Sequence, residues 1–279
     1  GGLMVKDFQL RFFSSIFLFL PLFLLFSKNV LIFLFVIQSL LSISLWEFLR
    51  LKSFKDNLKG RKKINILLSR HKVCSLDFFI IFIVNVLLLL FFLNLNYILI
   101  FLILIFFLSY TYIILKFDFE KLLGLVYCSA PFFILIYLRN DYNFDQYLFF
   151  IFFFSILTDV FSYFSGNILK GKKIFPSISA GKTISGTLGG ILVPCIFCVF
   201  IFIDLIDLYL IVLSSVFFSI IVQLGDLLES YFKRLCNVKD SGNLIPGHGG
   251  VLDRLDGLFL LIIVIFILKI LNFNFFFII

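Results

Sequence analysis

The segment 225–257 gathers carboxylates and cations between two long apolar runs. Asp226 and Glu229 are spaced i,i+3, which places them on one face of a helix. Asp253 and Asp256 repeat this spacing after a glycine-rich turn. Mg²⁺ prefers hard oxygen ligands, and proteins usually hold it with one or two carboxylates together with substrate phosphates. The two carboxylate pairs therefore predict a site where they converge on one or two divalent cations.

The same segment carries positive side chains that suit phosphate oxygens, and Arg binds such oxygens bidentately. The turn 246–250 has few side chains, so a nucleotide can lie against its backbone. His248 in this turn either stabilises the turn, donates a hydrogen bond to substrate, or takes part in acid/base chemistry. An alternative is that the acids and bases only pair with one another at a membrane boundary. The cations are Lys233, Arg234, Lys239 and Arg254.

A second polar segment begins at Asp159, deep in an apolar run, and continues into a cation-rich loop. Small residues beside Lys at the start of a helix allow phosphate to approach its N-terminal N–H groups. The string Gly181-Lys182-Thr183 is not a P-loop, because Pro176 stands where that motif requires its first glycine. A packing role for Asp159 and a plain hinged loop remain alternatives. The candidate substrate contacts here are Asp159, Lys172, Ser179, Lys182 and Thr183.

Hydrophobic residues make up 62% of the 279 residues and charged residues 14%. Soluble domains average about 45–50% and about 25%. Long apolar runs recur at the length that crosses a bilayer, which excludes a soluble single-core protein. We therefore predict an all-α, polytopic transmembrane helical bundle with about nine spans. The predicted spans are 12–27, 30–48, 76–93, 97–115, 122–138, 146–164, 186–203, 208–224 and 255–271.

Most of the 24 Lys and Arg residues fall on one side of this arrangement when the N-terminus is cytoplasmic. That orientation places both polar segments and the basic loop 50–75 in the cytoplasm. The net charge of +8 indicates orientation and attraction to anionic lipid rather than nucleic-acid binding. We interpret 1–145 as scaffold and 146–279 as the catalytic domain. Glu47 lies beside a Trp at the inner boundary, and its reaching the site is an open alternative.

The charged segment resembles the signature of the phosphatidate cytidylyltransferase (CDP-diacylglycerol synthase) family. The segment 159–186 is similar to that family's second motif region and departs from it at Asn167, Ala180, Gly181, Ile184 and Ser185. The residues that carry the first resemblance are Ser230, Lys233-Arg234, Lys239-Asp240, Gly242, Pro246, His248-Gly249-Gly250 and Asp253-Arg254-Leu255-Asp256.

This resemblance implies a Mg²⁺-dependent nucleotidyltransferase that converts CTP and phosphatidate into CDP-diacylglycerol and pyrophosphate. We expect it in the cytoplasmic membrane of a bacterium, with its active site facing the cytoplasm, one or two Mg²⁺ ions, and assembly as a homodimer. The implied metal ligands are Asp226, Asp253 and Asp256. The implied catalytic residues are Asp226, Lys233, Arg234, Lys239, Asp253 and Arg254. The implied substrate contacts are Asp159, Lys172, Ser179, Lys182, Thr183, Lys239, His248, Gly249 and Gly250.

Three other functions remain open at this point. A CTP-dependent lipid kinase of the polyprenol or phytol type would release CDP and a lipid phosphate instead of pyrophosphate. A cation transporter would also place carboxylates in spans, although most acids here lie at the predicted cytoplasmic boundary. A catalytically inactive scaffold would fail to bind CTP.

Overall fold

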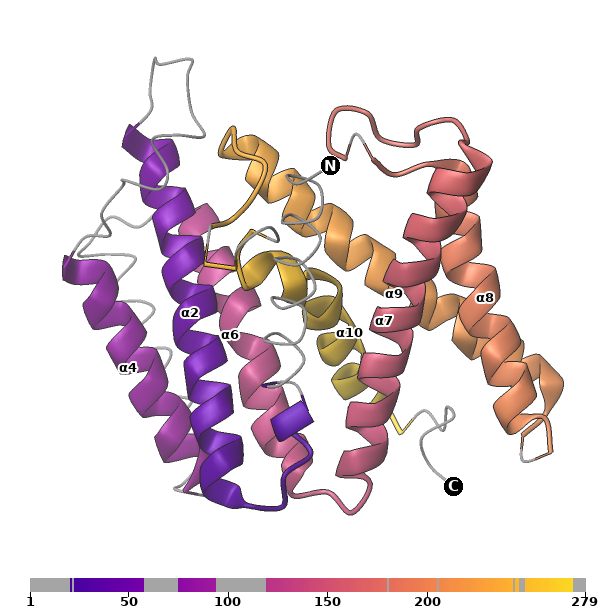
Figure 1. Cartoon of the computed structure of the whole chain (residues 1–279). Coiled ribbons are helices and arrows are strands. Elements are labelled where there is room, and N and C mark those ends of the chain that lie inside the picture. The colour runs from indigo at the N-terminus through magenta and orange to yellow at the C-terminus, as the bar shows by residue number, and fades with distance from the viewer. Residues whose placement is uncertain are drawn as a thin grey trace, which may run out of the picture. The chain divides into compact units, whose positions relative to one another are not determined.

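A computed structural model describes residues 21, 23–57, 75–93, 119–179, 181–204, 206–242, 244–245 and 249–272. These residues form helices without any strand beyond two isolated bridges (Figure 1). Five helices are long and apolar enough to cross a membrane, which agrees with the predicted all-α, polytopic membrane architecture. The helices are α2 (Val30–Asn57), α4 (Ser75–Phe92), α6 (Phe119–Arg139), α7 (Phe144–Leu169), α8 (Ile184–Phe202), α9 (Leu208–Leu235) and α10 (Leu252–Ile270).

Each described helix coincides with one of the predicted spans, but some continue well beyond it. The largest extension is at α9, which runs to Leu235 and so places Asp226 and Glu229 on the helix itself. The predicted spans 12–27 and 97–115 lie largely or wholly outside the described residues. The number of nine spans and the cytoplasmic N-terminus therefore stay predictions.

The chain divides into two compact units that interleave in sequence. The first comprises Gly1–Tyr137 and Leu235–Arg254, and the second comprises Leu138–Arg234 and Leu255–Ile279. The charged segment 225–257 is therefore shared between the units, with α10 beginning in one and continuing in the other. The predicted division into 1–145 and 146–279 stays a functional prediction.

In the first unit, α2 lies beside α4 and α6 (Figure 1). One face of α2 buries an apolar residue at every fourth position, the spacing that keeps side chains on one stripe of a helix. At Gly124 of α6 an added Cβ would overlap the ring of Phe48, so α6 approaches α2 closely there. The buried stripe consists of Phe33, Ile37, Leu41, Leu45 and Leu49.

Ion pairs join the ends of the same three helices. Lys52 Nζ on α2 lies 2.9 Å from Glu120 Oε2 on α6, and Lys121 Nζ on α6 lies 2.8 Å from Asp77 Oδ1 on α4. Lys52 and Asp77 are both buried, so each charge is offset by its partner.

In the second unit, α7 and α8 form a tight hairpin of small residues (Figure 1). A Cβ added at Gly186 of α8 would lie 2.8 Å from the main-chain oxygen of Ser162 on α7. At Gly189 and Gly190 an added Cβ would overlap the hydroxyls of Ser165 and Ser162. Such small residues let membrane helices approach backbone to backbone.

Helix α9 packs against this hairpin. The rings of Phe154 on α7 and Phe218 on α9 lie with centroids 5.3 Å apart. Gln223 Nε2 on α9 donates to the main-chain oxygen of Thr187 on α8 at 3.1 Å. The three helices therefore form one packed layer through both apolar and polar contacts.

An ion pair between Lys269 of α10 and Asp141, in the loop before α7, joins two distant parts of the second unit. Burial alone would raise the pKa of the Asp141 carboxyl, but the Asn143 N–H and the Lys269 ammonium lower it overall. The Asp141 carboxylate is therefore held in its charged form.

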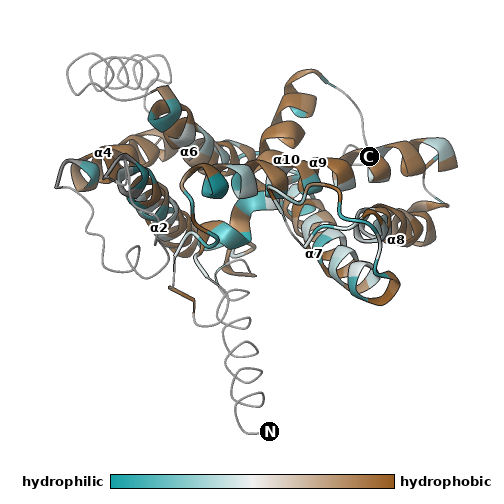
Figure 2. Cartoon of the chain, turned by 90° about the horizontal axis from the view of Figure 1, so that it is seen from above, coloured by the Kyte–Doolittle hydropathy of each residue, from teal (hydrophilic) through white to brown (hydrophobic). Residues whose placement is uncertain are grey.

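The outer surface of α8 is apolar, and Figure 2 shows the helix as hydrophobic over most of its length. Leu188, Leu192, Ile196 and Phe200 are exposed along it. Large exposed apolar side chains are expected where a helix contacts lipid instead of water.

Replacing Gly190 by Ala tests the α7–α8 contact. The new Cβ would overlap the Ser162 hydroxyl and lie 2.9 Å from the main-chain oxygen of Thr158, so the helices must separate. Overpacking of this kind costs about 1–3 kcal/mol, and we expect a lower thermal midpoint in detergent. Gly181→Ala is the control, since nothing lies within 4 Å of its added Cβ. Equal midpoints for the two variants would contradict the packing described here.

Candidate functional site

Two glycines bring α9 and α10 together at the acidic part of the second unit. A Cβ added at Gly225 would lie 2.7 Å from the main-chain oxygen of Asp256. One added at Gly257 would lie 2.9 Å from Val222 Cγ1 and 3.3 Å from Asp226 Oδ1. The backbones of α9 and α10 are therefore in close contact at this crossing. This contact brings the neighbouring carboxylates together.

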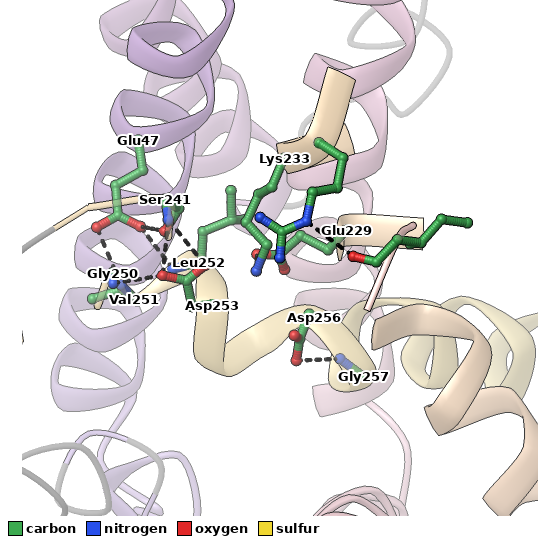
Figure 3. Close-up of polar contacts among 12 residues, drawn as sticks. Glu47, Glu229, Lys233, Ser241, Gly250, Val251, Leu252, Asp253, Asp256 and Gly257 are labelled. Carbon is green, nitrogen blue, oxygen red and sulfur yellow. Dashed lines mark hydrogen bonds and ion pairs between the residues drawn. The ribbon is translucent and has the colours of Figure 1, made fainter. Parts of the chain in front are cut away.

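Asp256 faces other carboxylates at this crossing. Its carboxyl group is in hydrogen-bonding reach of that of Asp226, and Glu229 and Asp159 are close enough to act on it electrostatically. Asp256 Oδ1 also accepts the N–H of Gly257 at 2.8 Å (Figure 3). Like charges this close are unfavourable unless a proton or a cation is shared between them.

Two Lys side chains lie among these acids. Lys182, from the loop before α8, places Nζ 3.1 Å from Asp226 Oδ2 and donates to the main-chain oxygen of Gln223 at 3.0 Å. Lys233 Nζ lies 3.1 Å from Glu229 Oε1, one helical turn away on α9. The prediction that Asp226, Glu229 and Lys233 share one face of α9 is thus confirmed. Lys182, from the loop before α8, contacts this face as well.

The loop between α7 and α8 folds back on itself before α8 begins. Ile174 N–H donates to the main-chain oxygen of Lys182 at 3.1 Å, and Ile184 N–H donates to that of Lys172 at 2.9 Å. Arg234 Nε of α9 donates to the main-chain oxygen of Ile178 at 3.0 Å. This loop is therefore attached to α9 by both Lys182 and Arg234.

The remaining predicted residues of this loop have distinct surroundings. The Thr183 hydroxyl accepts the Gly186 N–H at 3.1 Å and so caps α8. Ser179 is half-buried, and its N–H donates to the main-chain oxygen of Phe175 at 2.9 Å. Lys172 is exposed. Lys172 and Lys182 therefore offer cationic groups to a substrate, whereas the Thr183 hydroxyl caps α8.

In the first unit, the loop before α10 folds around Glu47 of α2 (Figure 3). Glu47 accepts hydrogen bonds from the Ser241 hydroxyl at 2.9 Å, the Val251 N–H at 3.1 Å and the Leu252 N–H at 2.8 Å. Arg50 Nη2 donates to the main-chain oxygen of Ser241 at 3.0 Å. This part of the predicted site therefore depends on a helix of the N-terminal half.

Asp253 also holds this loop. Its carboxylate accepts the Ser241 N–H at 2.9 Å and the Gly250 N–H at 2.8 Å (Figure 3). Gly249 adopts a φ of +90°, a conformation that favours glycine, and its main-chain oxygen accepts the Ile245 N–H at 2.9 Å. The loop thus forms a closed turn immediately before α10.

Two cations of the first unit are accessible. Lys239 in the loop and Arg254 in the first turn of α10 are exposed. His248 lies outside the described residues.

The carboxylates at the α9–α10 crossing suit a divalent cation by their chemistry. Within the described ranges, no three His, Cys, Asp or Glu side chains converge as a metal cluster. Magnesium needs fewer protein ligands, since one or two carboxylates suffice when substrate phosphates complete the shell. Asp226 and Asp256, whose carboxyl groups meet, fit that requirement.

Comparison with known proteins identifies the family. Residues 9–271 match the cytidylyltransferase family. The chain belongs to this family. The match includes every described helix, so the carboxylates of both units lie within it.

Individual bacterial relatives of the chain are named phosphatidate cytidylyltransferase. The Rickettsia conorii protein is 36% identical over 162 residues, covering 54% of this chain and 70% of the relative. The Staphylococcus saprophyticus protein is 37% identical over 155 residues, covering 54% and 56%. The Bacillus subtilis protein is 40% identical over 152 residues, covering 50% and 55%. The matched segments thus span only a little over half of the last two relatives.

Several polar contacts of the structure do not follow from the sequence. The sequence leaves Glu47 as an open alternative, assigns Arg50 to the basic loop 50–75 and gives Gln223 no role, whereas the structure places Arg50 buried in α2. A buried acid inside an apolar run is costly and marks a functional position by default, and that signal was present at Glu47. Arg50 and Gln223 had no comparable signal, because both act through main-chain oxygens that only the folded chain brings near.

Replacing Arg234 by Ala tests the attachment of the α7–α8 loop to α9. Hydrogen bonds that involve a charged group contribute about 1.5–3 kcal/mol, so we expect amide exchange across 174–182 to become at least about tenfold faster. Hydrogen–deuterium exchange of the detergent-solubilised protein measures this. Lys173→Ala is the matched control, since it removes an exposed positive charge from the same loop. Unchanged exchange in Arg234→Ala would show that Arg234 does not hold the loop.

Proposed function

We propose that the protein is a phosphatidate cytidylyltransferase, which transfers CMP from CTP to phosphatidate. A phosphate oxygen of the lipid attacks the α-phosphorus of CTP, and the bond to the β-phosphate oxygen breaks, releasing pyrophosphate and CDP-diacylglycerol. The observation that carries the proposal is the meeting of Asp226 and Asp256 beside Lys182. This arrangement offers a cation-binding pair and a phosphate-binding ammonium in a member of the cytidylyltransferase family.

Asp226 and Asp256 would hold Mg²⁺ in this proposal. When bound, Mg²⁺ supplies positive charge that stabilises the transferring phosphoryl group. The Lys182 ammonium, which pairs with Asp226 in this structure, would turn to a phosphate oxygen of CTP once the charge of the carboxylate pair is balanced. Lys172, exposed on the same loop, would bind a further phosphate oxygen. Phosphoryl transfer depends mainly on such positioning and charge stabilisation.

The loop of the first unit offers phosphate-binding groups of its own. Lys239 and Arg254 are exposed cations that suit the triphosphate or the lipid phosphate. Gly249, which is half-buried, remains a proposed substrate contact, whereas Gly250 is buried and donates its N–H to Asp253. Asp253 remains a proposed metal ligand, since each carboxylate oxygen has two lone pairs and the bonds to main-chain N–H groups do not use them all.

The proposal includes an integral protein of a bacterial cytoplasmic membrane, with the site facing the cytoplasm. The apolar helices support the membrane location, and the bacterial relatives support a bacterial source. The inner-face orientation rests on the distribution of Lys and Arg in the sequence. Assembly as a homodimer remains an expectation without further support.

The decisive experiment is product analysis on the purified protein in detergent with phosphatidate, radiolabelled CTP and Mg²⁺. We expect labelled CDP-lipid and pyrophosphate only when all three are present. Labelled CDP together with a newly phosphorylated lipid would instead identify the CTP-dependent lipid kinase. Metal flux into liposomes without CTP would identify a transporter.

Asp226→Asn and Asp256→Asn test the carboxylate pair. Each variant keeps the side-chain shape but removes a negative ligand, so we expect kcat to fall by at least about 100-fold, the scale of losing one stabilising group in a transition state. Asp145→Asn is the matched control, because Asp145 is exposed in the first turn of α7 and takes no part in the cluster. Full Mg²⁺-dependent turnover in either cluster variant, shown to be folded, would refute the assignment.

A further inference from the structure

Glu47 is a buried acid within α2, and its carboxylate accepts hydrogen bonds from one segment that is distant in sequence. The three donors are the Ser241 hydroxyl and the main-chain N–H groups of Val251 and Leu252. They lie 194, 204 and 205 residues further along the chain. A buried carboxylate is stable only when its oxygens accept such hydrogen bonds. Glu47 therefore requires this segment in one particular conformation.

Two glycines of the segment leave the room that Glu47 occupies. A Cβ added at Gly250 would overlap the Ser241 hydroxyl and both carboxylate oxygens of Glu47. One added at Gly242 would lie 2.7 Å from Glu47 Oε1 and 2.9 Å from Arg50 Nη2. Only the absence of side chains here admits the carboxylate.

Glu47 also supplies an acceptor at the start of α10. The first N–H groups of a helix have no acceptor within the helix, and a Ser, Thr, Asp or Asn side chain usually supplies one. Val251, directly before this helix, has an apolar side chain and cannot do so. The Glu47 carboxylate accepts the N–H of Val251 and that of Leu252, the first residue of the helix, and its negative charge suits the positive end of the helix dipole.

Arg50, one turn further along α2, completes the attachment. It is buried, its guanidinium lies 4.3 Å from the centroid of the Trp46 ring, and it donates to the main-chain oxygen of Ser241. Glu47 and Arg50 thus bind the hydroxyl and the carbonyl of the same residue. The opposite charges of the two residues offset part of the cost of burying each.

We propose that Glu47 is a positioning residue for the nucleotide-binding loop 239–253. The inference rests on the proposed cytidylyltransferase activity and extends it to the N-terminal half. Glu47 holds Ser241, Val251 and Leu252, and thereby sets where the Lys239 side chain, two residues before Ser241, meets the triphosphate.

A second consequence concerns the start of α10. The N–H groups of Val251 and Leu252 donate to Glu47, and the N–H of Gly250 donates to Asp253. These groups would otherwise form an anion site of the kind that binds phosphate at helix N-termini. Because the protein's own carboxylates fill that site, the loop must bind phosphate through its cationic side chains.

The variant Glu47→Gln tests this role with little change of shape. An amide brings one oxygen and an NH₂ group, so the NH₂ must face a main-chain N–H that also donates, and the loop loses its fixed form. We expect the KM for CTP to rise by at least about tenfold, the effect of losing about 1.4 kcal/mol of binding. The KM for phosphatidate should stay within about twofold, a difference of only about 0.4 kcal/mol.

Glu47→Asp and Ser44→Ala separate positioning from general stability. Glu47→Asp keeps the charge and should recover part of the affinity for CTP. Ser44 is buried on the same helix, but its hydroxyl donates only to the main-chain oxygen of Leu40, so Ser44→Ala should leave both KM values unchanged. A loss in Glu47→Gln that affects both substrates and the thermal midpoint equally, without recovery in Glu47→Asp, would overturn the proposal.

Hydrogen–deuterium exchange without substrates makes the inference independent of turnover. The Val251 and Leu252 amides should exchange at least about tenfold faster in Glu47→Gln and at the unaltered rate in Ser44→Ala. If the unaltered protein makes no CDP-lipid, the proposed function fails, while the exchange result still shows whether Glu47 holds the loop. Unaltered exchange together with an unaltered KM for CTP in Glu47→Gln would refute the positioning role itself.

Discussion

A carboxylate among apolar helices must find hydrogen-bond donors, an opposite charge or a cation, and this requirement organises both parts of the candidate site. Glu47 meets it fully, with two main-chain N–H groups and a hydroxyl. Asp256 meets it only in part, because it accepts the Gly257 N–H but also faces Asp226, with Glu229 and Asp159 nearby. The first arrangement is stable without any ligand and therefore shapes the chain. The second is stabilised when positive charge arrives, as expected of a group that binds a cation.

Close backbone contact is the second condition for the site. Gly225 and Gly257 allow α9 and α10 to cross with almost no separation, and the carboxylates of Asp226 and Asp256 meet there. The glycines of α8 do the same against α7, which carries Asp159. In both places the polar groups come together because neighbouring residues have no side chain. Several of the 12 glycines that the sequence gathers in 166–257 thus serve the packing around the acids instead of turns.

Much of this arrangement follows from local patterns in the sequence. Apolar runs predict the described helices, and the i,i+3 and i,i+4 spacings predict that Asp226, Glu229 and Lys233 share a face of α9. The contact between Lys182 and Asp226 does not follow, because nothing local relates residues of two different elements. The bonds from Glu47 to the loop before α10 are even less predictable, since about two hundred residues separate the partners. The same spacings do not reveal that Asp253 binds the loop backbone and that Thr183 caps α8.

The hydrogen bonds of Glu47 also limit which fragments of the chain can keep the structure of the loop before α10. The residues that resemble the family signature lie in the C-terminal half, which suggests a catalytic module that a shorter gene could encode. However, the Val251 and Leu252 N–H groups within that segment have their acceptor on α2. A fragment that begins after α2 would therefore contain the signature without the carboxylate that accepts these two bonds. Among the described residues, the helices of the N-terminal half thus supply structure that a truncated, rearranged or fused version of this enzyme would have to retain.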